Sequence, residues 1–170
     1  GVSGNNIWKY KSPTVQGVTV HAAHQFLNQG TAGTANDVTV DSYTDFGIEI
    51  SPEMVEGLTI GYATAEVEET TTKTNDESTL WIKYASGPIT VGYQTSEYDA
   101  PTSSASDDTT AFGISYAVND NLSISYNEHT VDVGSSATDQ EADGFSVSYT
   151  MGGLTLAGHS NEMSSVNGVF

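Results

Sequence analysis

The stretch that decides the fold is TTAFGISYAVNDNLSISYNEHT, residues 109–130. Large apolar side chains alternate with small or polar ones along residues 112–118, and again along residues 122–126. Between these runs lie Asn119, Asp120 and Asn121, residue types that favour tight turns. Strict alternation on both sides of a turn predicts a β-hairpin with one apolar, aromatic face and one face of small or polar side chains.

The same hairpin recurs along the whole chain. Its second arm is visible as GLTIGY at 57–62, PITVGY at 88–93 and NLSISY at 121–126. Tight turns are expected near residues 14, 54, 87, 120 and 152, which gives a repeat of about 32 to 40 residues. Polar segments between the hairpins predict long loops at 28–40, 68–76, 99–108 and 132–141, with a polar tail at 164–170. We therefore expect about ten strands of roughly nine to eleven residues, in one domain over residues 1–170 or a contiguous portion of one.

Composition excludes several classes of protein. The 22 acidic residues face four lysines and no arginine, for a net charge of −18, which argues against a nucleic-acid partner. The absence of cysteine excludes disulfides and thiolate metal sites. No apolar run is long enough for a transmembrane helix, and the opening residues do not resemble a signal peptide, as expected of a processed or truncated chain. Almost all acidic residues are expected in the long loops.

Two folds satisfy the alternation: a soluble β-sandwich with a buried apolar face, and a transmembrane barrel whose apolar face meets lipid. Strands of about 9–11 residues are long enough to cross a bilayer at a tilt, and short turns at one edge with long loops at the other are typical of outer-membrane barrels. Tyr10, Tyr84, Tyr116 and Tyr149 recur just before tight turns, as in an aromatic girdle. The prediction is an all-β, antiparallel, up-and-down transmembrane β-barrel. The alternative is a secreted or cell-surface acidic β-sandwich that binds Ca²⁺ or a partner.

The sequence resembles the Gram-negative general porins, in particular the alphaproteobacterial type. The resemblance rests on NIWKYKSP at 6–13, on the repeated G-[LI]-T-[IVL]-G-Y strand openings, and on the Asp/Ser/Thr-rich segments between hairpins. It implies a barrel of about sixteen strands, usually a homotrimer, in outer-membrane lipid, through which small hydrophilic solutes and ions diffuse passively. Since only about ten strands are visible, this chain would be part of such a barrel, although a small closed barrel stays open.

The polar face of the strands supplies the candidate site. The residues expected to line a pore are Lys9, Lys11, Lys83, Glu49, His21, Gln25, Gln94, Asn127 and His159. The resemblance implies that the three lysines and Glu49 are charges on the pore wall; the alternative is that they are solvated residues near a rim. The acidic loops predict a preference for cations.

No catalytic or cofactor motif is found, so we expect a protein that is not an enzyme and has no cofactor. Serines are abundant, but none lies in a nucleophile elbow and there is no glycine-rich phosphate loop. His21 and His24 have opposite parities, so one strand face cannot present both to a metal. Acidic segments at 76–77, 107–108 and 139–143 could bind Ca²⁺ through carboxylate oxygens, although they match no ordered calcium motif.

Overall fold

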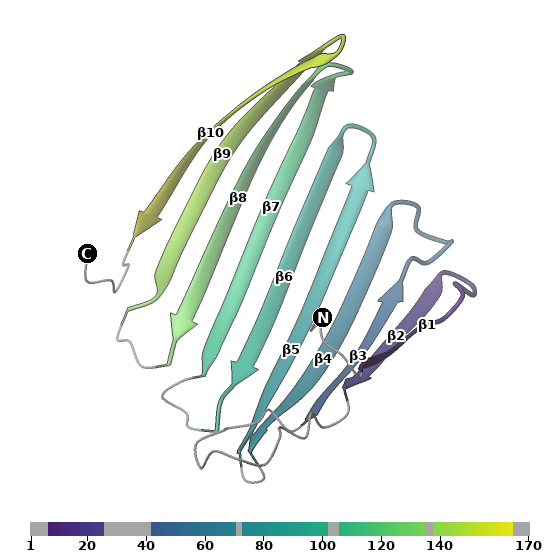
Figure 1. Cartoon of the computed structure of the whole chain (residues 1–170). Helices are drawn as coiled ribbons and strands as arrows, with labels where there is room; N and C mark the ends of the chain where they lie inside the picture. The colour runs from purple at the N-terminus through teal and green to yellow at the C-terminus, as the bar shows by residue number, and fades with distance from the viewer. Residues whose placement is uncertain (1–6, 26–41, 71–72, 102–105, 135–137, 165–170) are drawn as a thin grey trace.

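Ten antiparallel strands form a single sheet in which every strand pairs with its neighbour in sequence. The computed structural model describes residues 7–25, 42–70, 73–101, 106–134 and 138–164, so the expected loop at 28–40 and residues 165–170 lie outside it. Figure 1 shows the strands side by side in one tilted, curved layer. They are β1 (Ile7–Lys11), β2 (Val18–Gln25), β3 (Ser42–Ile50), β4 (Leu58–Thr70), β5 (Lys73–Ser86), β6 (Ile89–Asp99), β7 (Asp107–Asn119), β8 (Leu122–Val133), β9 (Gln140–Met151) and β10 (Leu154–Ser164).

The predicted tight turns are confirmed, and they lie along the upper edge of the sheet in Figure 1. Between β1 and β2, Val15 and Val18 exchange two backbone hydrogen bonds of 2.9 Å around Gln16 and Gly17. Both central residues have positive φ, 50° and 80°, as the two-residue turns that match strand twist require. Between β7 and β8, the side-chain oxygen of Asn119 accepts hydrogen bonds from the backbone N–H groups of Asn121 and Leu122. The residues of the tight turns therefore determine where the strands end at this edge of the sheet.

The expected loop at 68–76 is wrong, because most of this segment belongs to strands. β4 and β5 run to Thr70 and from Lys73, and Glu68 pairs directly with Thr74. Threonine favours strands, and pairing satisfies the backbone hydrogen bonds of this polar segment as well as water would. Five strands accordingly have 12 to 14 residues, longer than expected, while β1 has only five and β2 eight.

The expectation that acidic residues lie in loops is also wrong. Sixteen of the 22 acidic residues belong to strands, mostly toward the ends that lie opposite the tight turns. Because side chains alternate between faces, neighbouring acidic residues such as Asp76 and Glu77 point to opposite sides of the sheet. The sixteen are Asp45, Glu49, Glu66, Glu68, Glu69, Asp76, Glu77, Glu97, Asp99, Asp107, Asp108, Glu128, Asp132, Glu141, Asp143 and Glu162.

The sheet has no hydrophobic core. Along β7, Phe112, Ile114 and Tyr116 on the apolar face are 42%, 39% and 41% exposed, whereas Gly113 and Ser115 on the opposite face are half-buried. Within the described ranges the only buried hydrophobic residues are Ala23 and Tyr43. A β-sandwich would bury the apolar face against a second sheet, but these strands form one sheet, so the sandwich alternative is wrong. No helix in the described ranges is long and apolar enough to span a membrane.

Candidate functional site

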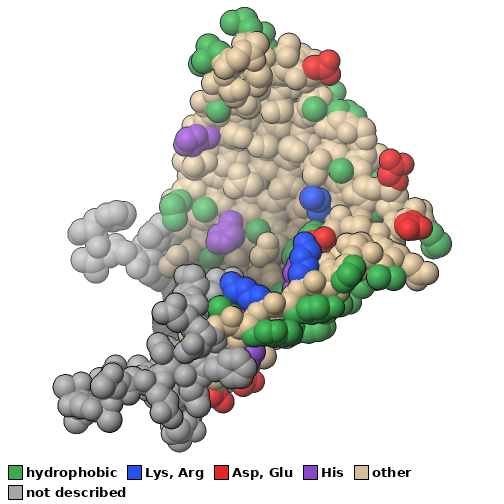
Figure 2. All heavy atoms as spheres, turned by 45° about the vertical axis from the view of Figure 1, so that its right-hand side comes forward, with side chains coloured by type: hydrophobic (Ala, Val, Ile, Leu, Met, Phe, Trp, Pro, Cys, Tyr) green, Lys and Arg blue, Asp and Glu red, His purple; other side chains and the backbone are tan. Residues whose placement is uncertain are grey.

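The pairing register places all nine predicted site residues on one face of the sheet, which we call the polar face. Residues directly opposite each other on neighbouring strands share a face. Lys11 lies opposite His21 in this way, and His159 opposite Ser146. Seen from one side, the surface in Figure 2 is mostly small or uncharged, with a few lysine and histidine side chains set into it. That the polar face lines a pore stays a prediction.

Charged side chains of the polar face are confined to one part of the sheet. Lys9, Lys11 and Lys83 lie on β1 and β5, and the strands β8, β9 and β10 contribute no Lys, Asp or Glu to this face. Besides Glu49, the register adds three carboxylates that sequence reasoning missed: Asp45, Glu77 and Asp107. The signal was available, because Asp45 and Glu77 have the same parity as Glu49 and Lys83 on their strands. Following the alternation to the ends of the strands would have found all three.

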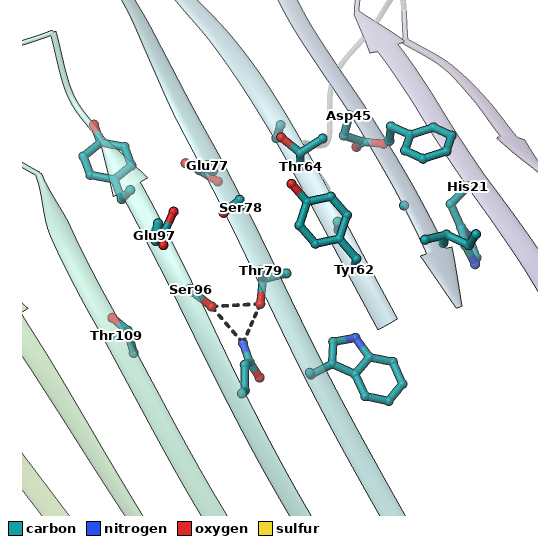
Figure 3. Close-up of a pocket in the computed structure, with 18 of the residues that line it drawn as sticks. His21, Asp45, Tyr62, Thr64, Glu77, Ser78, Thr79, Ser96, Glu97 and Thr109 are labelled. Atoms are coloured by element: carbon teal, nitrogen blue, oxygen red, sulfur yellow. Dashed lines mark hydrogen bonds between the residues drawn. The ribbon is translucent and has the colours of Figure 1, made fainter. Parts of the chain in front are cut away.

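All four of these carboxylates border a hollow of about 670 Å³ over β3 to β7. Asp45, Glu49, Glu77 and Asp107 belong to its lining, together with Glu97 and His21, and no lysine does. Figure 3 shows Asp45 and Glu77 on either side of Thr64, with His21 to one side. Clustered carboxylates raise the local concentration of cations, so we expect cations to gather at this hollow.

A hydrogen-bonded cluster of uncharged side chains stands in the same hollow. Ser96 Oγ donates to Thr79 Oγ1 at 2.8 Å, and Gln94 Nε2 donates to Thr79 Oγ1 at 3.2 Å and to Ser96 Oγ at 3.1 Å, the triangle drawn in Figure 3. Thr79 Oγ1 in turn donates to the carbonyl of Thr95 at 3.2 Å. These contacts hold the amide nitrogen of Gln94 and leave its oxygen as an acceptor for a solute.

Trp81 is a further residue of the polar face that sequence reasoning missed, besides the three carboxylates. It lies directly between Gly61 on β4 and Gln94 on β6. A Cβ built on Gly61 would fall on Cε2 and Nε1 of the indole, so the ring lies over the glycine, close to the backbone. A glycine opposite an aromatic residue is a recognised cross-strand pairing. Trp81 is two residues before Lys83 and so lies on the same face of β5, but only the register identifies Gly61 as its partner.

The described residues offer no metal centre. No group of three or more His, Asp or Glu side chains among them is arranged to hold a metal ion. Two of the pairs on which the Ca²⁺ expectation rested, 76–77 and 107–108, lie in β5 and β7, where their members point to opposite faces. Binding of Ca²⁺ stays a prediction, without those two pairs as its sites.

Comparison with known proteins identifies what the chain is similar to. A family profile described as "Gram-negative porin" matches residues 1–167. An anion-selective porin from Comamonas acidovorans superposes with a TM-score of 0.71 at 16% identity, over 93% of this chain and 49% of that one. A refined porin structure gives 0.69 at 14% identity, over 95% and 56%. OmpT, an outer membrane protein of Vibrio cholerae, gives 0.64 at 13% identity, over 92% and 53%.

These similarities differ in what they establish. At such identities the solved structures establish the fold alone, and the chain spans about half the length of each of them. The sequence has no significant match among curated proteins. The family profile, in contrast, covers almost the whole chain.

Proposed function

The chain belongs to the Gram-negative porin family of the bacterial outer membrane, and from this premise we propose that it forms part of the wall of a water-filled channel for small hydrophilic solutes and ions. One observation carries the proposal: the apolar, aromatic face of a single sheet is exposed, whereas its polar face is less exposed and contains a hollow. Outer-membrane barrels have this division between lipid and lumen.

Closure of the barrel is part of the proposal. β1 and β10 each have one neighbour in the described sheet, and an unpaired strand edge in lipid costs several kcal/mol for each unsatisfied backbone group. We expect the complete protein to pair both edges in a barrel of about sixteen strands. The family resemblance further implies a homotrimer, which chemical cross-linking of the natively extracted protein would test.

Transport would be passive and would prefer cations. Exclusion by pore size and the field of the wall charges suffice for it, so no catalytic step or cofactor is required. Among the polar-face residues whose side chains the structure describes, there are four carboxylates and three lysines, and the carboxylates gather in one hollow. The anion selectivity named for the porin from Comamonas acidovorans is a property of that protein. This chain lacks arginine, and its net charge is −18.

Reconstitution of the natively extracted protein in a planar bilayer tests the proposal. Under a KCl gradient we expect discrete, ohmic conductance steps and a reversal potential displaced toward the K⁺ equilibrium potential. Conductance with a reversal potential on the Cl⁻ side would retain the channel and overturn the cation preference. A correctly folded, full-length protein that inserts without conducting would overturn the channel itself.

A further inference from the structure

Two neighbouring hollows on the polar face share a boundary. The first is the hollow lined by carboxylates, and the second, of about 490 Å³, is lined by Lys83, Thr90 and Asn127 among others. Of the residues that the structure describes, Trp81 and Gln94 alone line both. A solute that moves along this wall from one hollow to the other therefore passes Trp81 and Gln94.

Trp81 is shaped for contact with a flat solute. Because Gly61 has no side chain, the indole lies close to the sheet, and only one of its faces is covered. The ring is half-buried, and its other face is turned to the hollows that it lines. An aromatic face with this exposure offers a large apolar contact area that is already ordered before a solute arrives.

Hydrogen-bonding groups flank the ring on both sides. Glu49, Gly61, Trp81 and Gln94 form one row across β3 to β6, each directly opposite the next. Strands lie about 4.8 Å apart, so Glu49 is one strand beyond Gly61, and Gln94 is one strand beyond Trp81. The Glu49 carboxylate is exposed, and Gln94 presents its amide oxygen, since its nitrogen is bonded to Thr79 and Ser96. Both groups accept hydrogen bonds from hydroxyls.

We propose that Trp81 is a stacking site for a neutral saccharide ring, whose C–H face covers the indole while its hydroxyls donate to Glu49 and Gln94. The inference rests on the channel function proposed above and adds a solute class to it. A neutral ring suits this position because an anion would meet the carboxylates of the first hollow, and a cation would meet Lys83 in the second. A pyranose carries no charge that either hollow repels.

The test compares glucose with sorbitol, which has a similar mass and number of hydroxyls but no ring. Each is titrated into the planar-bilayer experiment at matched osmolality. We expect glucose to reduce the KCl current saturably, with an apparent affinity roughly fivefold above that of sorbitol, a ratio that corresponds to about 1 kcal/mol. Trp81→Leu should abolish this difference while KCl conductance persists. Asn127→Leu, a polar-face variant in the second hollow alone, should retain it.

Equal effects of glucose and sorbitol on the unaltered channel would overturn the proposal, as would a glucose preference that survives Trp81→Leu. A protein without KCl conductance before any sugar is added would instead contradict the channel function. A second measurement avoids changing Trp81. In the intact protein, glucose should protect part of the tryptophan fluorescence from acrylamide quenching, and sorbitol should not; equal quenching with both would also overturn the proposal.

Discussion

The indole ring of Trp81 occupies the space that a side chain at Gly61 would need. The two residues are directly opposite each other on β5 and β4, and a Cβ on Gly61 would clash with ring atoms. Glycine is required here because an aromatic ring on the next strand lies over it. Gly92 on the same face is less constrained, because a Cβ there would come no closer than 3.8 Å to another atom.

Replacing Gly61 by alanine should therefore destabilise the sheet and displace Trp81. We expect a loss of about 1–3 kcal/mol in the free energy of unfolding, as for other overpacked sites, measured by urea unfolding in lipid vesicles. Gly92→Ala is the matched control and should be neutral or slightly stabilising, since alanine restricts the unfolded chain more than glycine does. Equal stability of the two variants would show that the ring does not depend on Gly61.

The alternation of faces predicts opposite results for two neighbouring acidic residues. Glu77 lies on the polar face beside the first hollow, whereas Asp76 lies on the apolar face of the same strand. Glu77→Gln should reduce the K⁺ over Cl⁻ permeability ratio, because it removes a wall charge. Asp76→Asn should leave the ratio nearly unchanged. Reversal potentials in a KCl gradient give both values, and a larger shift for Asp76→Asn would assign the faces the other way.

A lysine scan of two adjacent positions tests which face meets lipid. Ile114 lies on the apolar face of β7, and Ser115 on the polar face. A lysine on the lipid face near the bilayer midplane costs about 2–4 kcal/mol, so Ile114→Lys should impair membrane assembly. Ser115→Lys should assemble normally and shift the reversal potential toward Cl⁻. Heat-dependent mobility in detergent gels reports assembly, and normal assembly of Ile114→Lys would contradict the lipid-facing assignment.

Like charges face each other on the apolar side of the sheet, at the ends of the strands. Asp143 on β9 lies directly opposite Glu128 on β8 and Glu162 on β10. Like charges placed this way are destabilising, so Asp143→Asn should raise the free energy of unfolding by about 0.5 kcal/mol at low ionic strength. Added salt should reduce the gain, because salt screens exposed charges.

The control for this variant is Asp139→Asn, which removes the same charge outside the strands. It should change stability less than Asp143→Asn does. If both variants raise the free energy of unfolding equally, the overall net charge causes the effect, and the facing like charges on β8, β9 and β10 do not.

Alternation and turn chemistry made most of the fold predictable from sequence. The hairpin around Asn119 and Leu122 appears where it was expected, and Tyr84, Tyr116 and Tyr149 lie on the exposed apolar face near the tight turns. These features depend on neighbouring residues only, because the period of two and the turn residues are both local.

The other edge of the sheet was less predictable. Residues 68–70 and 73–76 are polar enough to be solvated as a loop, and pairing between β4 and β5 alone makes them strand. A similar misreading hid Asp107, which lies in the expected loop at 99–108, whereas Asp45 and Glu77 were missed because the alternation was not followed to the ends of their strands. The position of Trp81 over Gly61 depends on the register between β4 and β5. Sequence specifies the register only weakly where neither face of the strands is buried in a core.

Pairing restricted to sequence neighbours has a consequence for how such walls can diversify. No strand of the described sheet depends on a partner outside its own hairpin or the adjacent one. A duplicated or deleted hairpin would therefore enter or leave as one unit, and the pairing elsewhere would be preserved. Since barrel diameter grows with strand number, the bore of the channel can change in evolution by steps of two strands, without any new rule of assembly.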